Sequence, residues 1–413
     1  MIKISIMHYA APPIIGGVES TIFHHSRLLS QHGYKVEVIA GRGSAFQERV
    51  KFHLVPEFDS RHPKVLEIGQ ELAKGKVSEK FTTLKEKFFQ DLNTLLGDST
   101  FCIVHNILTL HKNLPLTAAL FEYNKQSKVQ LIAWCHDFAW KDKLYTEDLH
   151  PGYPWDLLRV PWPKVRYVTV SSHRQKNLAE LLGLPSEDIE VIPPGIDLER
   201  FFKLEQTTRQ LLGDFKLLDA EPLLLLPARI TRRKNIEFAL NMIAELKKDF
   251  PEVLLIVTGP PGPHNPKNLL YLEQLHAELK RLGIEKNVRF LYDWASEGNN
   301  TVISDEVIAD LYMLADGLLF PSFREGFGIP ILEAALARNE IFAADIPPVR
   351  ESSTGLVTLF DPHGDPHDAS RMLCGAFTQS RIYQLRKHVI HHYTWQSIVS
   401  RKIIPLFLEV KVG

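Results

Sequence analysis

Two glutamates eight residues apart are the first candidates for chemistry in this chain. Glu325 and Glu333 lie in the stretch "PSFREGFGIPILEAALAR", with Gly326 and Gly328 between them. In an unbroken helix at about 100° per residue their carboxylates would stand about 80° apart, but the glycines remove that constraint. Glu325 can then turn from a loop while Glu333 projects from the next helix, where the amides of Phe327 and Gly328 add donors. Such carboxylates suit two polyols, such as the hexose and the ribose of a sugar nucleotide.

A pair of cations follows the apolar run "PLLLLPA". Arg229 comes directly after this run, and Lys234 follows five residues later in "RITRRKN", just before an expected helix. Two long cations at a strand-to-helix turn suit a diphosphate, because arginine can bridge two oxygens and lysine acts as a point charge. The alternative is a solvated run of charge, which is how we interpret Arg232 and Arg233.

A histidine and an aspartate follow the run "QLIAWC". His136 and Asp137 could hydrogen-bond sugar or acceptor hydroxyls, and an imidazole can exchange a proton near neutrality. Asn106, after "FCIVH", and Trp140, in the long aromatic segment 138–164, are further candidates for acceptor contacts. For the aromatic side chains of that segment, ordinary packing is the interpretation we favour over stacking on a ligand.

A glycine pair precedes the first expected helix. Gly16 and Gly17 lie in "HYAAPPIIGGVES", where a glycine turn would present backbone amides at a helix N-terminus, a place that suits anions. The pattern is not GxGxxG, which argues against a dehydrogenase. A loop that simply enters a helix is the alternative.

All these residues follow short β-rich runs that alternate with amphipathic stretches. The runs are "IKISIMHY", "KVEVIAG", "FCIVHN", "KVQLIAWC" and "RYVTVSS", and the pattern restarts with "PLLLLPAR", "EVLLIVTG", "NVRFLY" and "DGLLFPS". The alternation predicts an α/β fold with two doubly wound parallel sheets. Pro193, Pro194 and Gly195 place the boundary between domains 1–194 and 195–393. Ligands of such sheets bind beyond the carboxyl ends of the strands, where the candidate residues lie.

Bulk composition narrows the class of protein. With 413 residues and a formal charge of −1, the chain suits two domains and has no global field that would draw it to nucleic acid or a membrane. Three isolated cysteines, Cys102, Cys135 and Cys374, indicate a reduced, cytoplasmic protein. The lysine-rich stretch 71–89 could lie on a membrane, but its glutamates favour a solvated helix that covers the first domain.

Taken together, these motifs resemble the family 4 retaining glycosyltransferases. "GGVE", "HD", Arg229 with Lys234, "VIPPGID" and "PSFREGFGIPILEA" occur in the order and approximate spacing of that family, over essentially the whole chain. The resemblance implies the GT-B fold: two Rossmann-like domains face each other across a cleft, the first binding the acceptor and the second the nucleotide sugar. It also implies that a final helix, about 394–413, crosses back onto the first domain.

The resemblance assigns roles to the second-domain residues. Arg229 and Lys234 would hold the diphosphate and neutralise the departing nucleotide. Glu325 would bind hydroxyls of the transferred sugar, Glu333 the ribose, and the loop at 326–328 would border the donor.

In the first domain, Gly16 and Gly17 would approach the donor phosphate and the acceptor, and His136 would contact the transferred sugar near the reaction centre.

We therefore expect transfer of a hexose, glucose or mannose, from a nucleoside diphosphate sugar to a hydroxyl of a sugar, sugar acid or glycoside, with retention. No DxD motif occurs, so we expect no metal and no other cofactor; cations and helix-end amides would stabilise the leaving group. The loop 293–306 leaves the base open among UDP, GDP and ADP, and the insert 138–164 leaves the acceptor open.

Four other functions are alternatives to transfer of a hexose to a small acceptor. A sugar-nucleotide epimerase of the same architecture would need no acceptor, which the aromatic segment near His136 argues against. A lipid- or polysaccharide-directed glycosyltransferase is a further alternative. A binding protein with a dead site is disfavoured because the whole set of candidate residues is present. A phosphorylase would need a cofactor lysine or phosphate site that we do not find.

Overall fold

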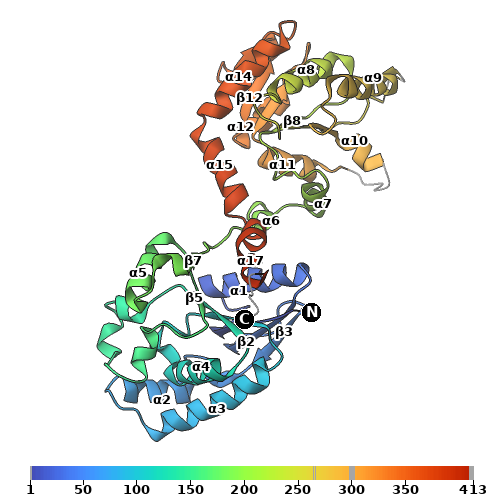
Figure 1. The fold of residues 1–413 in the computed structure, drawn as a ribbon. Coiled ribbons are helices and arrows are strands. Elements are labelled where there is room, and N and C mark those ends of the chain that lie inside the picture. Colours follow the sequence, from blue (N-terminus) through green and yellow to red (C-terminus); the bar gives the residue numbers. More distant parts are fainter. Residues whose placement is uncertain (1, 264, 266, 297–302, 409–413) are drawn as a thin grey trace. The chain divides into compact units, whose positions relative to one another are not determined.

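The computed structural model describes residues 2–263, 265, 267–296 and 303–408. The chain divides into two compact units (Figure 1). The first comprises residues 1–196 together with 393–413, and the second comprises residues 197–392.

The first unit is built on a parallel sheet. In the described part of the chain it has seven strands in the order β3-β2-β1-β4-β5-β6-β7. Its strands are β1 (Lys3–Ala10), β2 (Lys35–Arg42), β3 (Val50–Leu54), β4 (Phe101–His105), β5 (Gln130–Cys135), β6 (Arg166–Thr169) and β7 (Ile189–Val191). The central strands are buried on both faces, which is why they read as continuous apolar runs.

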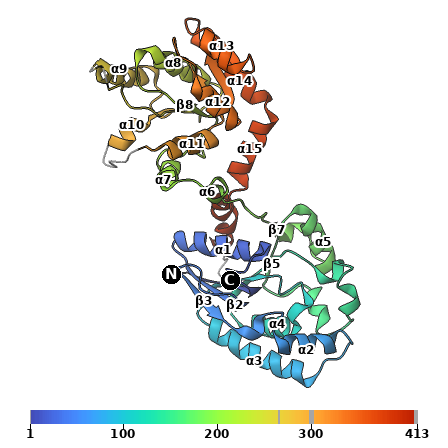
Figure 2. The same ribbon diagram turned by 180° about the vertical axis from the view of Figure 1, so that it is seen from behind.

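Helices cover both faces of this sheet (Figures 1 and 2). They are α1 (Gly17–Gln31), α2 (Pro63–Leu72), α3 (Glu79–Leu96), α4 (Leu114–Gln126) and α5 (Ser172–Leu182). Alternate strand residues serve the two faces: Ile6 packs in the cluster that contains α1, and Met7 packs in the cluster that contains α2, α3 and α4. The doubly wound arrangement predicted from the alternating pattern is confirmed.

The C-terminal segment returns to the first unit, as the resemblance implied. It consists of α16 (Trp395–Ile398), the π-helix η9 (Val399–Ile403) and α17 (Pro405–Leu408). Trp395 stacks on His24 of α1 with 5.0 Å between ring centroids, and Phe407 lies 5.0 Å from Phe101 of β4. These buried aromatic contacts complete the core on the α1 face of the sheet.

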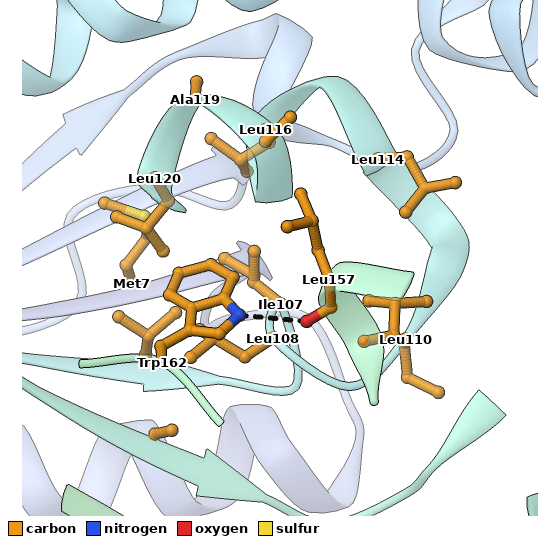
Figure 3. Close-up of a cluster of buried hydrophobic side chains, with 14 of the residues drawn as sticks. Met7, Ile107, Leu108, Leu110, Leu114, Leu116, Ala119, Leu120, Leu157 and Trp162 are labelled. Carbon is orange, nitrogen blue, oxygen red and sulfur yellow. Dashed lines mark hydrogen bonds between the residues drawn. The ribbon is translucent and has the colours of Figure 1, made fainter. Parts of the chain in front are cut away.

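The aromatic segment after β5 is ordered by packing. It contains three short 3-10 helices, η3 (Ala139–Lys141), η4 (Thr146–Asp148) and η5 (Trp155–Leu158). Trp162 is 3% exposed, its indole N–H donates to the Leu157 carbonyl at 2.9 Å, and its ring lies among leucines of α4 (Figure 3). Trp155 is also 3% exposed. Packing is thus the main task of these two tryptophans, as the sequence interpretation favoured.

The lysine-rich stretch 71–89 is not one helix, because it contains the end of α2 and the first part of α3. Gly75 takes a φ of +73°, which separates α2 from α3. Helix α3 buries Phe81, Leu84 and Phe88, whereas Lys80 pairs with Glu67 of α2. The helix therefore covers the first unit and has paired charge on its outer face.

The second unit is built on a second parallel sheet. Its order in the described residues is β10-β9-β8-β11-β12-β13. The strands are β8 (Leu223–Leu226), β9 (Leu254–Val257), β10 (Val288–Phe290), β11 (Gly317–Phe320), β12 (Glu340–Ala344) and β13 (Thr358–Phe360). Leu224 and Leu225 point into different clusters on opposite faces, as in the first unit.

Helices also cover both faces of the second sheet. They are α6 (Leu198–Phe202), α7 (Gln206–Asp214), α8 (Ile236–Leu246), α9 (Lys267–Leu282), α10 (Leu291–Trp294), α11 (Asp305–Leu314), α12 (Ile329–Leu336), α13 (Pro347–Ser353), α14 (Pro366–Gln379) and α15 (Arg381–His392). Within the described ranges of the whole chain, none of the helices is both long and apolar enough to cross a membrane.

Candidate active site

Two neighbouring strands of the second unit bring most of the predicted donor residues together. β8 and β11 pair in parallel, so the loops that follow them leave the same edge of the sheet. The first loop contains Arg229 and the 3-10 helix η7 (Arg232–Lys234), and the second spans residues 321–328. The amide of Phe323 donates to the Arg233 carbonyl at 2.9 Å, which joins the two loops directly.

Lys234 and Glu325 form an ion pair in this joined region. Nζ of Lys234 lies 2.5 Å from Oε1 of Glu325, and both side chains are 9% exposed. The ammonium group also lies 5.3 Å from the ring centroid of Phe320, at the end of β11. The structure thus brings together a lysine and a glutamate that the sequence assigned to different parts of the donor.

Arg233 is a site residue that the sequence interpretation missed. Its Nη1 lies 3.4 Å from Oε2 of Glu325 and donates to the Arg324 carbonyl at 3.2 Å. Its neighbour Arg232 turns away, hydrogen-bonds Gln274 and lies over the ring of Tyr271. Treating Arg232 as surface charge agrees with the structure, but Arg233 contributes to the electrostatics around Glu325.

Arg229 has the opposite environment to Lys234. It is exposed, and no carboxylate of the described residues forms an ion pair with it. Its backbone is held where β9 ends, because Ile230 donates to the Pro260 carbonyl at 3.0 Å. The loop after β8 therefore contains a cation without a counter-ion in the described residues and a lysine that is paired with Glu325.

Gly259 is a second residue that the sequence interpretation passed over. A Cβ atom at this position would lie 2.4 Å from the Ala228 carbonyl oxygen and 2.7 Å from the Arg229 amide nitrogen. Real Cβ contacts are not that short, so a side chain would displace the backbone that positions Arg229. The signal was present in the sequence, since "TGPPG" follows an apolar run.

The two glycines of the opening motif have different tasks. Gly328 adopts a φ of +97° as the N-cap residue of α12, and Pro330 lies in the first turn of that helix. Gly326 has no positive φ and open space around its α-carbon. The predicted break before the helix thus depends on Gly328.

Glu333 lies on α12 and is exposed. Its Oε2 accepts a hydrogen bond from the hydroxyl of Tyr312, on α11, at 2.7 Å. The other carboxylate oxygen has no protein hydrogen-bond partner in the described part of the chain. The structure separates the environments of Glu325 and Glu333, one buried and paired with cations, the other exposed and held by a tyrosine.

In the first unit, Asn106 supports the turn that carries His136 and Asp137. Its Oδ1 accepts from the amide of His136 at 2.8 Å and from that of Asp137 at 3.3 Å. Asn106 itself is 5% exposed and has a φ of 60°. This arrangement gives Asn106 a positioning task beneath the turn. The Asp137 carboxylate lies 3.2 Å from the guanidinium of Arg174 and is half exposed.

Four histidines distant in the sequence meet around this turn. His105 Nδ1 lies 3.2 Å from His136 Nε2, and His8 Nδ1 lies 2.9 Å from the His105 carbonyl oxygen. The ring of His25 lies 5.8 Å from that of His105 and 4.7 Å from that of Trp134. Both ring nitrogens of His25, which is 0% exposed, lack a hydrogen-bond partner among the described residues.

Burial keeps this histidine cluster neutral. It lowers the pKa of His8 and of His136 to about 4 and that of His25 to about 3, and it holds the pKa of His105 well below its usual range. Repulsion from neighbouring imidazoles lowers the pKa values of His8, His25 and His105 further. Burial therefore favours the neutral imidazole of His136 at pH 7, whereas the sequence suggested proton exchange near neutrality.

The glycine turn after β1 leads directly into α1, as expected. Gly16 is the N-cap residue of α1 and Gly17 its first residue. A Cβ atom on Gly16 would lie 2.1 Å from Oε2 of Glu19, so a carboxylate of the same helix lies against this turn. The anion-binding position at this N-terminus thus has an internal carboxylate beside it.

The remaining predicted positions are Trp140 and the loop 293–306. Trp140 is half-buried, its indole N–H donates to the Trp155 carbonyl at 3.2 Å, and the guanidinium of Arg159 lies 4.1 Å from its ring centroid. The base-reading loop expected at 293–306 lies partly outside the described residues, since 297–302 are not described.

Comparison with known proteins defines the class. The family model "Glycosyltransferase Family 4" matches residues 15–200, and "Glycosyl transferases group 1" matches residues 212–374. Together the two models match most of the chain and divide it as the two sheets do. The protein belongs to the family 4 glycosyltransferases, and its two Rossmann-like units have the GT-B fold.

Individual curated relatives share between 25% and 30% of the aligned residues with this chain. A mannosylglucosylglycerate synthase of Petrotoga mobilis is 26% identical over 63% of this chain and 64% of its own length. One from Thermotoga maritima is 25% identical over 84% of this chain and 83% of its own length. A D-inositol 3-phosphate glycosyltransferase of Nocardia farcinica is 30% identical over 54% of this chain and 47% of its own length. The matches thus span between about half and four fifths of these relatives.

Proposed function

We propose that the protein transfers a hexose, glucose or mannose, from a nucleoside diphosphate sugar to a hydroxyl of a small sugar, sugar-acid or glycoside acceptor, with retention at the anomeric carbon. Membership of the glycosyltransferase family supports the reaction class. The names of the Thermotoga and Nocardia relatives refer to a glycerate and to an inositol phosphate, which supports a small polyol acceptor.

The observation that carries the proposal is the exposed Arg229 in the same loop as Lys234, which pairs with Glu325. Arg229, without a counter-ion in the described residues, is free to take diphosphate oxygens, and an incoming anion is also attracted by Lys234 and Arg233. Glu325, held in one orientation by its two cationic neighbours, can accept hydrogen bonds from hydroxyls of the transferred sugar. Glu333, with one oxygen held by Tyr312, is available to a ribose.

In the reaction we propose, the acceptor oxygen attacks the anomeric carbon on the face that the phosphate leaves. The bond from this carbon to the acceptor oxygen forms as its bond to the phosphate oxygen breaks, and the acceptor proton passes to the departing phosphate oxygen. The cations of the β8 loop and the amides at the start of α12 would stabilise the negative charge of the leaving group, so the step needs no metal ion. His136 would take part as a neutral hydrogen-bonding group.

The test is product analysis with UDP-, GDP- and ADP-glucose and GDP-mannose in the presence and absence of EDTA. Proton NMR of the product from an α-linked donor should show an α-glycoside, at equal rates with and without the chelator. A β-glycoside would contradict retention, and loss of activity in EDTA would contradict metal independence. Release of nucleotide with a rearranged hexose and no need for an acceptor would establish the epimerase alternative instead.

A further inference from the structure

A depression of about 550 Å³ lies in the first unit, beyond the carboxyl ends of its strands. Arg61 comes from the segment after β3, Lys112 from the segment after β4, and Trp155 from the segment after β5. Helix α2 forms one side. The volume is that of a site for a small molecule, and the edge of the sheet is where ligands of such folds bind.

Two cations of this depression have no compensating carboxylate. Arg61 and Lys112 are exposed, and neither forms an ion pair within the described part of the chain. The lysines of α2 and α3 differ, since Lys64 and Lys87 both pair with Glu57. The cations of the depression therefore differ from these two lysines in having no carboxylate partner in the described residues.

The other titratable groups of the lining leave the depression positive. Asp148 lies 3.9 Å from Nε2 of His111, and burial lowers the pKa of His111, which favours its neutral form. The lining thus carries two positive charges and one negative charge at pH 7. A ligand with one anionic group complements that balance.

The lining also contains a buried donor without a partner. Trp155 is 3% exposed, and its indole nitrogen has no hydrogen-bond partner among the described residues. The nitrogen itself is enclosed, so it is a buried donor behind the lining and not one exposed in the depression. Apolar Leu72 and Leu114 complete a lining suited to the C–H face of a sugar.

The depression is linked to the His136 turn by the backbone. The amide of Ala139, three residues after His136, donates to the Thr109 carbonyl at 2.9 Å, two residues before His111. The hydroxyl of Tyr9, at the end of β1, donates to the Leu110 carbonyl at 3.4 Å. The segment that positions Lys112 is therefore fixed to the same turn that positions the candidate catalytic histidine.

From these observations we infer that the depression binds the acid group of the acceptor, and that the acceptor is a small sugar derivative with a carboxylate or a phosphate. Arg61 and Lys112 hold the anion. The inference rests on the proposed function in calling this ligand the acceptor. The anion site itself is testable without turnover.

The first experiment measures binding by NMR titration of the whole protein with D-glycerate, inorganic phosphate and uncharged glycerol. Arg61→Ala and Lys112→Ala are compared with Arg49→Ala and Lys128→Ala, which remove exposed cations of the same unit. Loss of one charged hydrogen bond should raise the Kd of the anion about tenfold or more. We expect this effect in the first two variants only. Anion binding no tighter than that of glycerol, or equal binding by all variants, would overturn the inference.

The second experiment measures turnover of matched acceptors, glucose against glucuronate and against glucose 6-phosphate, with vesicles of phosphatidylglycerol as a lipid arm. We expect the charged sugars to be preferred, with Arg61→Ala and Lys112→Ala raising their KM while the KM of the donor and of glucose stay unchanged. Transfer to uncharged sugars alone, or to lipid alone, would overturn the inference but leave hexose transfer in place. No hydrolysis or transfer with any donor would instead contradict the proposed function, and the binding result would still decide the anion site.

Discussion

Lys234 and Glu325, from two adjacent loops of the second sheet, form an ion pair with 2.5 Å between Nζ and Oε1 and only 9% exposure of either side chain. A buried pair of this kind contributes little net stability, yet loss of one partner leaves an uncompensated charge and costs about 3–5 kcal/mol. The pair therefore supports the site in two ways: it fixes the orientation of Glu325, and it gives Lys234 a counter-ion in a partly apolar environment.

The first prediction tests the energetic coupling between Lys234 and Glu325. Lys234→Met or Glu325→Leu alone should lower the melting temperature of the second unit by roughly 6–20 °C, because each leaves a buried charge. The double variant should recover a large part of that loss, since both charges are gone. Calorimetry measures the stability, and neither the single nor the double variants should transfer sugar. Additive losses in the double variant would show that the pair is not coupled.

A matched control for this cycle is Arg232→Met. Arg232 belongs to the same 3-10 helix but is turned toward Gln274 and away from Glu325. The expected change in stability is under about 0.5 kcal/mol, as for other exposed charges.

The second prediction concerns Arg229. Because this side chain is exposed and forms no ion pair with the described residues, Arg229→Ala should leave the melting temperature nearly unchanged. Loss of a charged hydrogen bond to the diphosphate should weaken nucleoside diphosphate binding by about 10- to 100-fold. Isothermal titration with UDP, GDP and ADP, and with the corresponding nucleosides, measures the effect. Equal weakening of nucleoside binding would contradict a contact with the diphosphate.

The third prediction uses the buried histidines. The folded pKa of His25, about 3, lies below the value of about 6.5 for an unfolded histidine. Between these values the unfolded chain binds the extra proton, so stability contributed by neutral His25 is complete above pH 6.5 and is lost as the pH falls toward 3. His25→Phe should remove this pH-dependent loss of stability, which amounts to up to about 1.4 kcal/mol per pH unit. It also replaces two ring nitrogens that have no hydrogen-bond partner in the described residues with carbon.

The measurement is the difference in urea-unfolding free energy between wild type and His25→Phe at pH 8 and at pH 5. The variant should gain stability relative to wild type at pH 5 and show a smaller difference at pH 8. His173→Phe, which changes an exposed histidine of α5, is the control and should show no such change with pH. Parallel pH curves for wild type and His25→Phe would mean that His25 takes up its proton in the folded state at the ordinary pH.

The sequence was sufficient for the parts of the site that depend on local pattern. Runs of apolar residues identified β8 and β11, and the loops that follow them, which contain Arg229 and Glu325, leave the sheet at one edge as expected. The sequence does not predict in which direction a side chain points within a turn. Arg232 and Arg233 are identical and adjacent, yet η7 directs only the second toward Glu325.

The histidine cluster shows the other limit of sequence reasoning. His8, His25, His105 and His136 belong to four separate elements, and no spacing pattern relates them. They meet because β1, β4 and β5 are neighbours in the sheet and α1 packs over that end. Their pKa values follow from burial, which depends on the assembled fold.

The last prediction concerns the two glycines between the glutamates. Gly328 has a φ of +97°, and a Cβ atom there would lie 3.3 Å from the side chains of Ile331 and Ser352, so Gly328→Ala combines backbone strain with crowding. We expect a cost of about 1–3 kcal/mol in stability and weaker binding of nucleoside diphosphate sugar, because the start of α12 must shift. Gly326→Ala, two residues away with open space and no positive φ, should be tolerated in both respects. Calorimetry and donor titration of the two variants side by side measure the contrast, and similar behaviour of both would mean that the left-handed residue does not position the helix.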